Sequence, residues 1–150
     1  MEDVMKASRR NILVVDDQEV VRKSYLRSLA DTRSNVEAVD SGDEALRAMQ
    51  ARRFDVVMLD LRMPGRDGMS VLRTIKEKWP ESEVVVITGY PSVDTAKEAI
   101  RLGACDYLAK PVSPDDVIRA ADGAMMCKHW TLRAEHAGYA TRTGATAGAR

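Results

Sequence analysis

The stretch Asp55-Val56-Val57-Met58-Leu59-Asp60-Leu61-Arg62-Met63-Pro64-Gly65 decides the fold of this chain. Its four consecutive apolar residues, 56–59, are typical of a short strand that is buried on both faces. The run ends in the carboxylate of Asp60, and Pro64-Gly65 then forces a loop. An acid at the C-terminal end of a buried parallel strand lies where open α/β sheets bind their ligands. We therefore predict that Asp60 is the reactive residue. The alternative is a loop aspartate that caps the next turn.

The bulk composition indicates a soluble cytoplasmic protein with one domain. The 150 residues include 23 Lys and Arg and 23 Asp and Glu, so no net charge points to nucleic acid or to an anionic membrane. Two cysteines, Cys105 and Cys127, do not make a disulfide framework and favour a reducing compartment. No apolar run is long enough to span a membrane, and the first ten residues lack the apolar core of a signal peptide.

Strands and helices are predicted to alternate along the chain. Short apolar runs predict strands at 12–15, 36–39, 56–59, 84–87 and 106–109. Helical spacing of apolar residues predicts a helix after each strand: 18–30, Ser41 through Met49, Met69 to Trp79, Ser92 to Gly103, and Ser113 through Met125. Ser41, with Glu44 three residues later, has the capping-box pattern. In the fourth helix, Val93, Ala96 and Ile100 are expected to face inward.

Five β-α units in succession predict an α/β fold with helices on both faces of a parallel sheet. Because crossover connections are right-handed, few topologies remain. We predict a flavodoxin-like, doubly wound (βα)5 fold with the strand order 2-1-3-4-5. The folded domain is expected to cover 11–130. Residues 1–10 are predicted to form a disordered extension, and 131–150 the end of the last helix and a flexible tail or linker stub.

Polar residues lie at the C-terminal ends of four of the predicted strands: Asp16 and Asp17, Asp60, Thr88, and Lys110. Because these ends meet at one edge of a parallel sheet, we expect the side chains to converge. Three clustered carboxylates repel one another unless a cation lies among them, and oxygen ligands suit Mg²⁺. Asp60 could then act as a nucleophile toward a phosphoryl group. Lys110 would supply charge and Thr88 a hydrogen bond.

Taken together, these motifs resemble the receiver domain of two-component response regulators, the CheY-like family. The resemblance spans about 11–129. It is carried by Asp16-Asp17, Asp60-x-x-Met63-Pro64-Gly65-x-Asp67-Gly68, Thr88-Gly89 and Asp106-Tyr107-x-x-Lys110-Pro111.

The resemblance implies that Asp60 accepts a phosphoryl group from the phosphohistidine of a sensor histidine kinase or phosphotransfer protein. It also implies Mg²⁺ bound by Asp17, Asp60 and the backbone carbonyl of Arg62, with Asp16 acting through water. Thr88 and Lys110 would bind the phosphoryl oxygens, and the Lys110–Pro111 bond would be cis.

The resemblance further implies a conformational switch. Thr88 would move toward the phosphoryl group and Tyr107 would turn inward, which remodels the face formed by the fourth helix, fifth strand and fifth helix. Tyr107 could instead be an ordinary half-buried strand aromatic. The bulk of Arg62 and Tyr90, each two residues beyond a site residue, is predicted to tune the lifetime of the aspartyl phosphate.

Besides the kinase, we expect a downstream protein or an effector attached in a longer chain as the partner. We expect no direct binding of this domain to nucleic acid or to a membrane. A homodimer could use Met125 and Met126 as contact residues. The only chemistry expected is phosphorylation and dephosphorylation of the chain itself, so the protein is not expected to be an enzyme.

Two other functions compete with the switch. A Mg²⁺-dependent aspartyl-phosphate phosphatase of the haloacid-dehalogenase kind needs its nucleophile after the first strand and a second acid two residues later. Here the first-strand acids are adjacent and Asp60 follows the third strand. The other alternative is a receiver-like scaffold that binds partners without phosphorylation. Phosphorylation of Asp60 would separate the scaffold from the switch.

Overall fold

The structure is a computed structural model, and it describes residues 9–136. The predicted N-terminal extension, except for its last two residues, and the tail from 137 onward lie outside this part of the chain. The extension was predicted one residue too long, because Arg10 already begins the first strand. The Arg10 guanidinium donates a hydrogen bond to Ser34 Oγ (2.8 Å) and pairs with Asp122 (2.6 Å), and these contacts fix it against the sheet.

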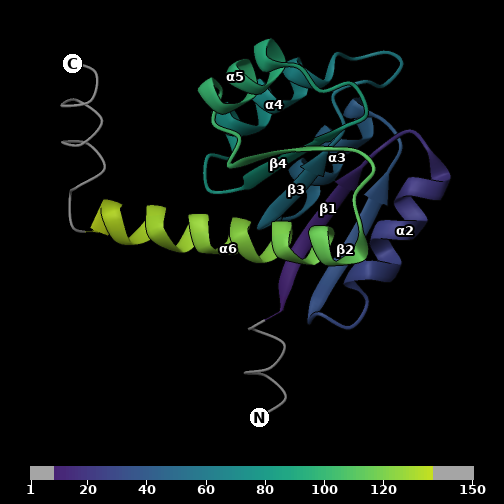
Figure 1. Cartoon of the computed structure of the whole chain (residues 1–150). Helices are drawn as coiled ribbons and strands as arrows, with labels where there is room; N and C mark the ends of the chain where they lie inside the picture. Colours follow the sequence, from purple (N-terminus) through teal and green to yellow (C-terminus); the bar gives the residue numbers. More distant parts are fainter. Residues whose placement is uncertain (1–8, 137–150) are drawn as a thin grey trace.

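Five strands form one parallel sheet (Figure 1). They are β1 (Arg10–Val15), β2 (Ser34–Val39), β3 (Val56–Leu59), β4 (Glu83–Thr88) and β5 (Asp106–Ala109). The order β2-β1-β3-β4-β5 confirms the predicted flavodoxin-like topology. β1 and β3 are neighbours at the centre, where the direction of winding reverses, and ligands bind at such a point in doubly wound sheets.

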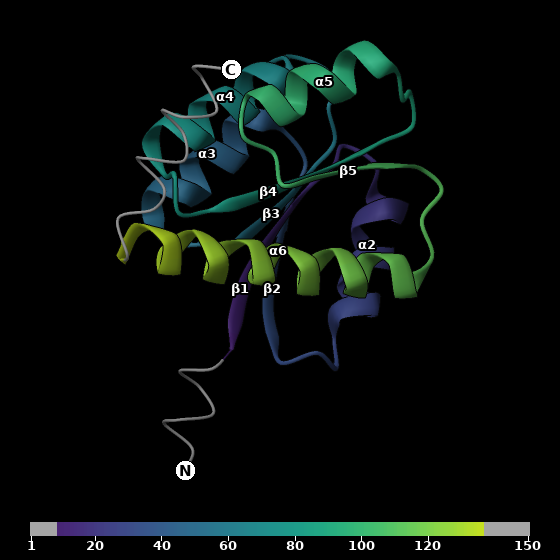
Figure 2. The same ribbon diagram turned by 60° about the vertical axis from the view of Figure 1, so that its left-hand side comes forward.

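Helices cover both faces of the sheet. They are α2 (Glu19–Leu29), α3 (Gly42–Ala51), α4 (Gly68–Lys78), α5 (Val93–Arg101) and α6 (Pro114–His136). Figures 1 and 2 show α2 and α6 on one face and α3, α4 and α5 on the other. None of the helices that the structure describes is long and apolar enough to cross a membrane.

Alternation of side chains along the strands builds two cores. In β1, Leu13 and Val15 pack under α3, α4 and α5, whereas Ile12 and Val14 pack under α2 and α6. All residues of β3 and β4 are buried, which explains why both strands were visible as continuous apolar runs. The sheet therefore gives a rigid support for the loops at its C-terminal edge.

The side chains that cap the helix N-termini are largely those that the sequence predicts. Ser41 Oγ accepts a hydrogen bond from the Glu44 N–H (3.2 Å), and Ser92 Oγ accepts one from the Thr95 N–H (3.1 Å). The reciprocal half of the predicted capping box is replaced by an ion pair between Glu44 and Arg47.

The orientation of α5 was predicted wrongly. Val93 and Ile100 are 69% and 52% exposed and Ala96 is half-buried, whereas Ala99 is fully buried. Ala99 packs into the core under α3, α4 and α5, so the side of α5 that carries Val93 and Ile100 lies at the surface. Apolar side chains of α5 are therefore presented to solvent beside β5.

Candidate functional site

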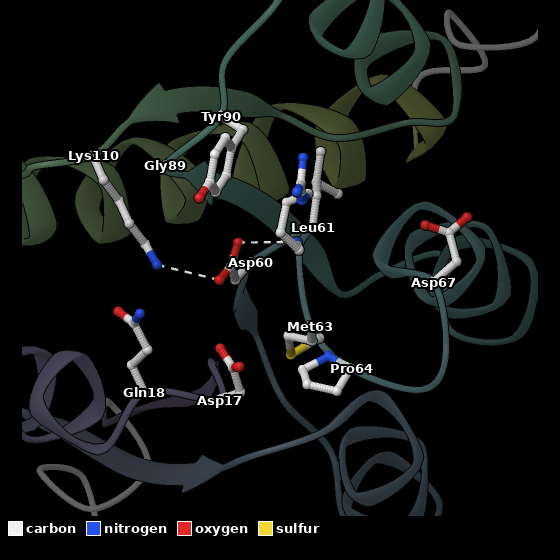
Figure 3. Close-up of a pocket in the computed structure, with 11 residues that line it drawn as sticks. Asp17, Gln18, Asp60, Leu61, Met63, Pro64, Asp67, Gly89, Tyr90 and Lys110 are labelled. Carbon is white, nitrogen blue, oxygen red and sulfur yellow. Dashed lines mark hydrogen bonds and ion pairs between the residues drawn. The ribbon is translucent and has the colours of Figure 1, made fainter.

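An open pocket of about 770 Å³ lies at the C-terminal edge of the sheet (Figure 3). The loops after β1 and β3 form one side of it, and the segments after β4 and β5 the other. Its lining residues are Asp17, Gln18, Asp60, Leu61, Arg62, Met63, Pro64, Asp67, Gly89, Tyr90 and Lys110. The predicted convergence of strand-end residues at one edge is therefore found in the structure.

Three carboxylates gather at this pocket. Asp16, Asp17 and Asp60 each place a carboxylate oxygen within 4.8 Å of the others. Asp16 and Asp60 are buried and Asp17 is exposed. Backbone pairing fixes the two buried acids, because the Asp16 N–H bonds to the Val39 carbonyl and the Asp60 N–H to the Val15 carbonyl (3.2 and 3.0 Å).

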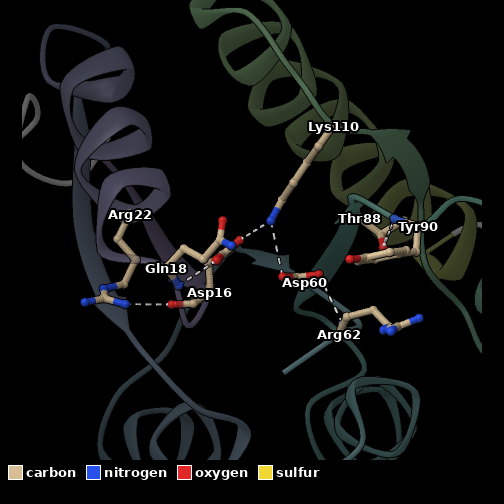
Figure 4. A network of polar contacts seen from close by, with 8 residues as sticks. All are labelled: Asp16, Gln18, Arg22, Asp60, Arg62, Thr88, Tyr90 and Lys110. Carbon is tan, nitrogen blue, oxygen red and sulfur yellow. Dashed lines mark hydrogen bonds and ion pairs between the residues drawn. The ribbon is translucent and has the colours of Figure 1, made fainter. Parts of the chain in front are cut away.

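The Lys110 ammonium joins the two buried carboxylates (Figure 4). Its Nζ lies 2.7 Å from Asp16 Oδ2 and 3.2 Å from Asp60 Oδ2. Burial alone would lower the pKa of Lys110, but the Asp16 and Asp60 carboxylates outweigh this effect and raise it above its ordinary value. The ammonium therefore stays charged at neutral pH. The Lys110–Pro111 peptide bond is cis, as expected.

The environment of Asp60 favours a cation in the pocket. Burial raises the pKa of Asp60, and the charge of Asp16 adds to this effect. The Arg62 N–H, which donates to Asp60 Oδ1 (3.1 Å), and Lys110 act in the opposite direction. Two nearby cationic or hydrogen-bonding groups thus offset only part of the cost of burying this charge. A further positive charge would favour the ionised carboxylate.

The donor set fits a magnesium ion. Three carboxylates beside one ammonium leave the cluster with excess negative charge, and Mg²⁺ prefers oxygen ligands of this kind. The structure thus brings together the three predicted aspartate ligands. Arg62, the fourth predicted ligand, lines the same pocket, and its carbonyl contact stays a prediction.

Thr88 ends β4 beside the pocket without lining it. Its side chain is 1% exposed, and its Oγ1 accepts a hydrogen bond from the Tyr90 N–H (3.1 Å). Gly89 and Tyr90, which follow it, contribute to the pocket wall. In this conformation the Thr88 hydroxyl serves the turn after β4.

Tyr107 connects β5 to the first turn of α5. Its hydroxyl lies 2.6 Å from Thr95 Oγ1 and accepts a hydrogen bond from the Ser92 N–H (3.2 Å). The ring is half-buried against the core under α3, α4 and α5. A movement of Tyr107 would break both contacts and release the start of α5.

Arg62 and Tyr90 meet across the pocket. The Arg62 guanidinium carbon lies 4.1 Å from the centre of the Tyr90 ring, a cation–π contact. Both side chains are more exposed than Asp60 and lie at the pocket wall. Their stacking joins the loop after β3 to the loop after β4 beside the Asp60 carboxylate, as Figure 4 shows.

Four residues of this region were missed by the sequence reasoning. The Gln18 N–H donates to Asp16 Oδ1 (2.9 Å), and Arg22 Nη1 donates to the Asp16 carbonyl (2.9 Å). Their position just after Asp16-Asp17, at the start of α2, was an available signal. Tyr25 is buried, and its hydroxyl has no hydrogen-bond partner among the residues that the structure describes. Burial, with the charges of Asp16 and Asp60, raises its pKa.

The fourth missed residue is Gly68, which begins α4 against the loop that carries Arg62. A Cβ atom at Gly68 would lie 2.5 Å from Leu61 Cα and 2.6 Å from the Leu61 oxygen. The backbone of α4 therefore touches the segment that follows Asp60 directly. The motif Asp67-Gly68 contains this residue, but no pattern reveals the close approach.

Comparison with known proteins identifies similar chains. The family model of the response regulator receiver domain matches residues 12–122. The alginate biosynthesis transcriptional regulatory protein AlgB of Pseudomonas aeruginosa is 36% identical over 124 residues, which are 83% of this chain and 28% of that protein. The DNA-binding transcriptional regulator NtrC of Klebsiella pneumoniae is 35% identical over 112 residues, 75% of this chain and 24% of that protein.

A solved structure agrees with these sequence matches. Crystalline NtrX from Brucella abortus superimposes with a TM-score of 0.79 at 33% identity, covering 85% of this chain and 29% of that one. The chain thus spans less than a third of each of these three proteins.

Proposed function

Because the chain belongs to the response regulator receiver family, we propose that it is a phosphorylation switch in which Asp60 accepts the phosphoryl group. The observation that carries this proposal is the placement of Asp60. Its buried carboxylate lies at the floor of an open pocket, beside two further aspartates and one lysine ammonium. The phosphoryl donor is a phosphohistidine of a sensor kinase or phosphotransfer protein.

In the proposed reaction an oxygen of the Asp60 carboxylate attacks phosphorus in line with the bond to the donor. The new O–P bond forms while the P–N bond to histidine breaks, and its electron pair stays on that nitrogen. The Lys110 ammonium, 3.2 Å from Asp60, can shift to a phosphoryl oxygen and neutralise its charge. The Arg62 N–H keeps the other carboxylate oxygen in place.

Asp16, Asp17, Asp60 and the carbonyl of Arg62 are the groups that would hold Mg²⁺, with Asp16 acting through water. When bound, the ion supplies positive charge that lets the buried Asp60 remain ionised and balances the incoming phosphoryl group. With the ion bound, the Asp16 carboxylate would have a second cation beside it, so the Lys110 ammonium would be available to the phosphoryl oxygens.

The proposed switch uses the contacts of Thr88 and Tyr107. The Thr88 hydroxyl, which accepts a hydrogen bond from the Tyr90 N–H, would leave that contact and donate a hydrogen bond to a phosphoryl oxygen. Tyr107 would then leave Thr95 and Ser92 and turn inward, which changes the face formed by α5, β5 and α6. Phosphorylation thereby selects one of two arrangements of this face.

The changed face would control a partner protein or an effector domain. The similarity to AlgB, NtrC and NtrX, of which this chain matches less than a third, supports an effector attached in a longer regulator. Self-association is a second proposed output. Met126 is 63% exposed on α6 and available for it, whereas Met125 is half-buried against the core under α2 and α6. We propose no enzymatic activity on other molecules.

Incubation with acetyl phosphate and Mg²⁺, followed by intact-mass measurement, tests the proposal. We expect one added phosphoryl group on the wild type, none on Asp60→Asn, and none when a chelator is added first. Asp67→Asn is the matched control, since Asp67 lines the same pocket but lies apart from Asp60 and caps α4 (Figure 3). Asparagine can also cap a helix, so this variant should be phosphorylated like the wild type.

An unmodified wild-type protein that binds Mg²⁺ would refute the switch and favour the scaffold alternative. Phosphorylation of Asp60→Asn to the wild-type level would show that another residue is the acceptor. We do not propose the phosphatase, because its nucleophile follows the first strand, whereas Asp60 follows β3.

A further inference from the structure

The two cysteines lie together at the opposite end of the sheet from the phosphorylation pocket. Cys105 directly precedes β5, and Cys127 lies in the second half of α6. Although the two residues are far apart in sequence, Cys105 packs against the core under α2 and α6, and Cys127 lies three residues after the buried Ala124, on the same face of α6. Cys127 is also among the groups that raise the pKa of Cys105, in agreement with this placement. Both side chains are half-buried, so neither is fully shielded from solutes.

Independent contacts hold both cysteines at this position. The Cys105 N–H donates to the Val84 carbonyl (2.8 Å), which fixes it beside the start of β4. The neighbour of Cys127, Lys128, donates from Nζ to the Glu81 carbonyl (2.9 Å) and pairs with Asp55 (3.5 Å). The backbone of α6 is therefore attached to the same edge of the sheet that carries Cys105.

We propose that Cys105 and Cys127 are an oxidation site, which forms an intramolecular disulfide between the start of β5 and α6. The oxidant is a peroxide or another two-electron acceptor. One thiolate attacks the peroxide O–O bond and becomes a sulfenic acid, with release of water. The other thiol then attacks this sulfur, the S–S bond forms, and a second water leaves. The two thiols lose two electrons and two protons, and one peroxide is reduced to two waters.

The surroundings of Cys105 make oxidation of this pair slow. Burial is the largest cause that raises the pKa of Cys105 to about 12, and the nearby Cys127, Glu83 and Asp106 add to this effect. A thiol kept protonated is a poor nucleophile, so Cys105 reacts slowly at neutral pH both with a peroxide and with a sulfenic acid. The dithiol form is consequently stable under reducing conditions and converts slowly.

The disulfide would restrain the face that the phosphorylation switch uses, a consequence that rests on the proposed function. Cys105 lies two residues before Tyr107, and α6 forms the other side of the same face. A covalent bond between the start of β5 and α6 would limit how far these two elements can separate. Oxidation and phosphorylation would thus act on one surface from opposite ends of the sheet.

The full chain, treated with hydrogen peroxide or diamide and then alkylated under non-reducing conditions, tests the oxidation site. We expect loss of both alkylatable thiols, a mass lower by two hydrogen atoms, a monomer on a non-reducing gel, and a peptide that joins Cys105 to Cys127. Dithiothreitol should restore both thiols. Cys127→Ser should form no intramolecular disulfide, and its Cys105 should remain alkylatable.

Retention of both thiols, or disulfides formed only between chains, would overturn the proposal. Rapid oxidation of Cys105 in the Cys127→Ser variant would overturn the low reactivity inferred for the Cys105 thiol. These readouts need no phosphoryl donor, whereas the Asp60→Asn comparison is carried out under reducing conditions. Failure of the oxidation site and failure of the phosphorylation switch are therefore observed separately.

Discussion

Replacing Gly68 with alanine introduces one methyl group where α4 meets the loop after Asp60. The methyl carbon would lie 2.5 Å from Leu61 Cα, whereas ordinary contacts begin at 3.4 Å, so the two backbones must separate by about 0.9 Å. No flexible side chain is available to yield, because the nearest atoms are backbone atoms of Leu61. Overpacking of this kind costs about 1–3 kcal/mol of the free energy of unfolding.

The same displacement should impair phosphorylation more than it impairs folding. Leu61 lies between Asp60 and Arg62, whose N–H bonds to the Asp60 carboxylate. A misplacement of about 1 Å at a reacting group can lower a rate about 100-fold. We expect a fall of this order in the rate of phosphorylation by acetyl phosphate, measured at a temperature where the variant remains folded.

Gly123→Ala is the matched control for this substitution. Gly123 lies within α6, and a Cβ atom there would have no atom of the described part of the chain within 4 Å. Alanine should therefore raise the free energy of unfolding by about 1 kcal/mol through helix propensity alone, with an unchanged phosphorylation rate. Urea unfolding of the wild type and both variants measures the changes in the free energy of unfolding, and the reaction with acetyl phosphate measures the phosphorylation rates. A Gly68→Ala variant as stable and as active as the wild type would refute the reasoning.

Three further substitutions test individual contacts. Tyr90→Ala or Arg62→Ala should shorten the half-life of the aspartyl phosphate about fivefold, because a cation–π contact of about 1 kcal/mol and its bulk are lost. Tyr90→Phe keeps the ring and should decay like the wild type, and unchanged decay in both alanine variants would contradict the prediction. Tyr25→Phe removes a buried hydroxyl that has no partner within residues 9–136, and it should raise the free energy of unfolding by about 1 kcal/mol, measured in urea; a loss of stability would mean that this hydroxyl is paired. Thr95→Val removes one of the two partners of the Tyr107 hydroxyl and should increase the fraction phosphorylated by acetyl phosphate, since the unphosphorylated arrangement is weakened; a smaller fraction would argue against a restraining role.

The sheet and the position of the site were predictable because both depend on local patterns. β3 and β4 are buried on both faces, so their apolar runs are continuous and unambiguous. A polar residue after each such run then lies at one edge of the sheet. This reasoning predicted that Asp60, Asp16 and Lys110 would meet, and their contacts confirm it.

Features that depend on how elements pack were not predictable in the same way. Apolar spacing identified α5 as a helix but gave its orientation wrongly, because the fully buried Ala99 decides which side approaches the sheet. The partner of the Tyr107 hydroxyl on α5 depends on that orientation. The sequence did not reveal that the Tyr25 hydroxyl lacks a partner within the described residues, because a tyrosine and a phenylalanine give the same apolar pattern along a helix.

The bond from Lys110 to Asp16 and Asp60 means that the chain carries its own counterion. Removal of divalent metal should therefore prevent the proposed phosphorylation without unfolding the protein, since the ammonium still neutralises part of the charge of the buried Asp16 and Asp60. In the proposed switch, loss of magnesium would therefore leave a folded receiver domain that cannot be phosphorylated. The opposite behaviour is found in small zinc domains, which lose their fold together with their ion.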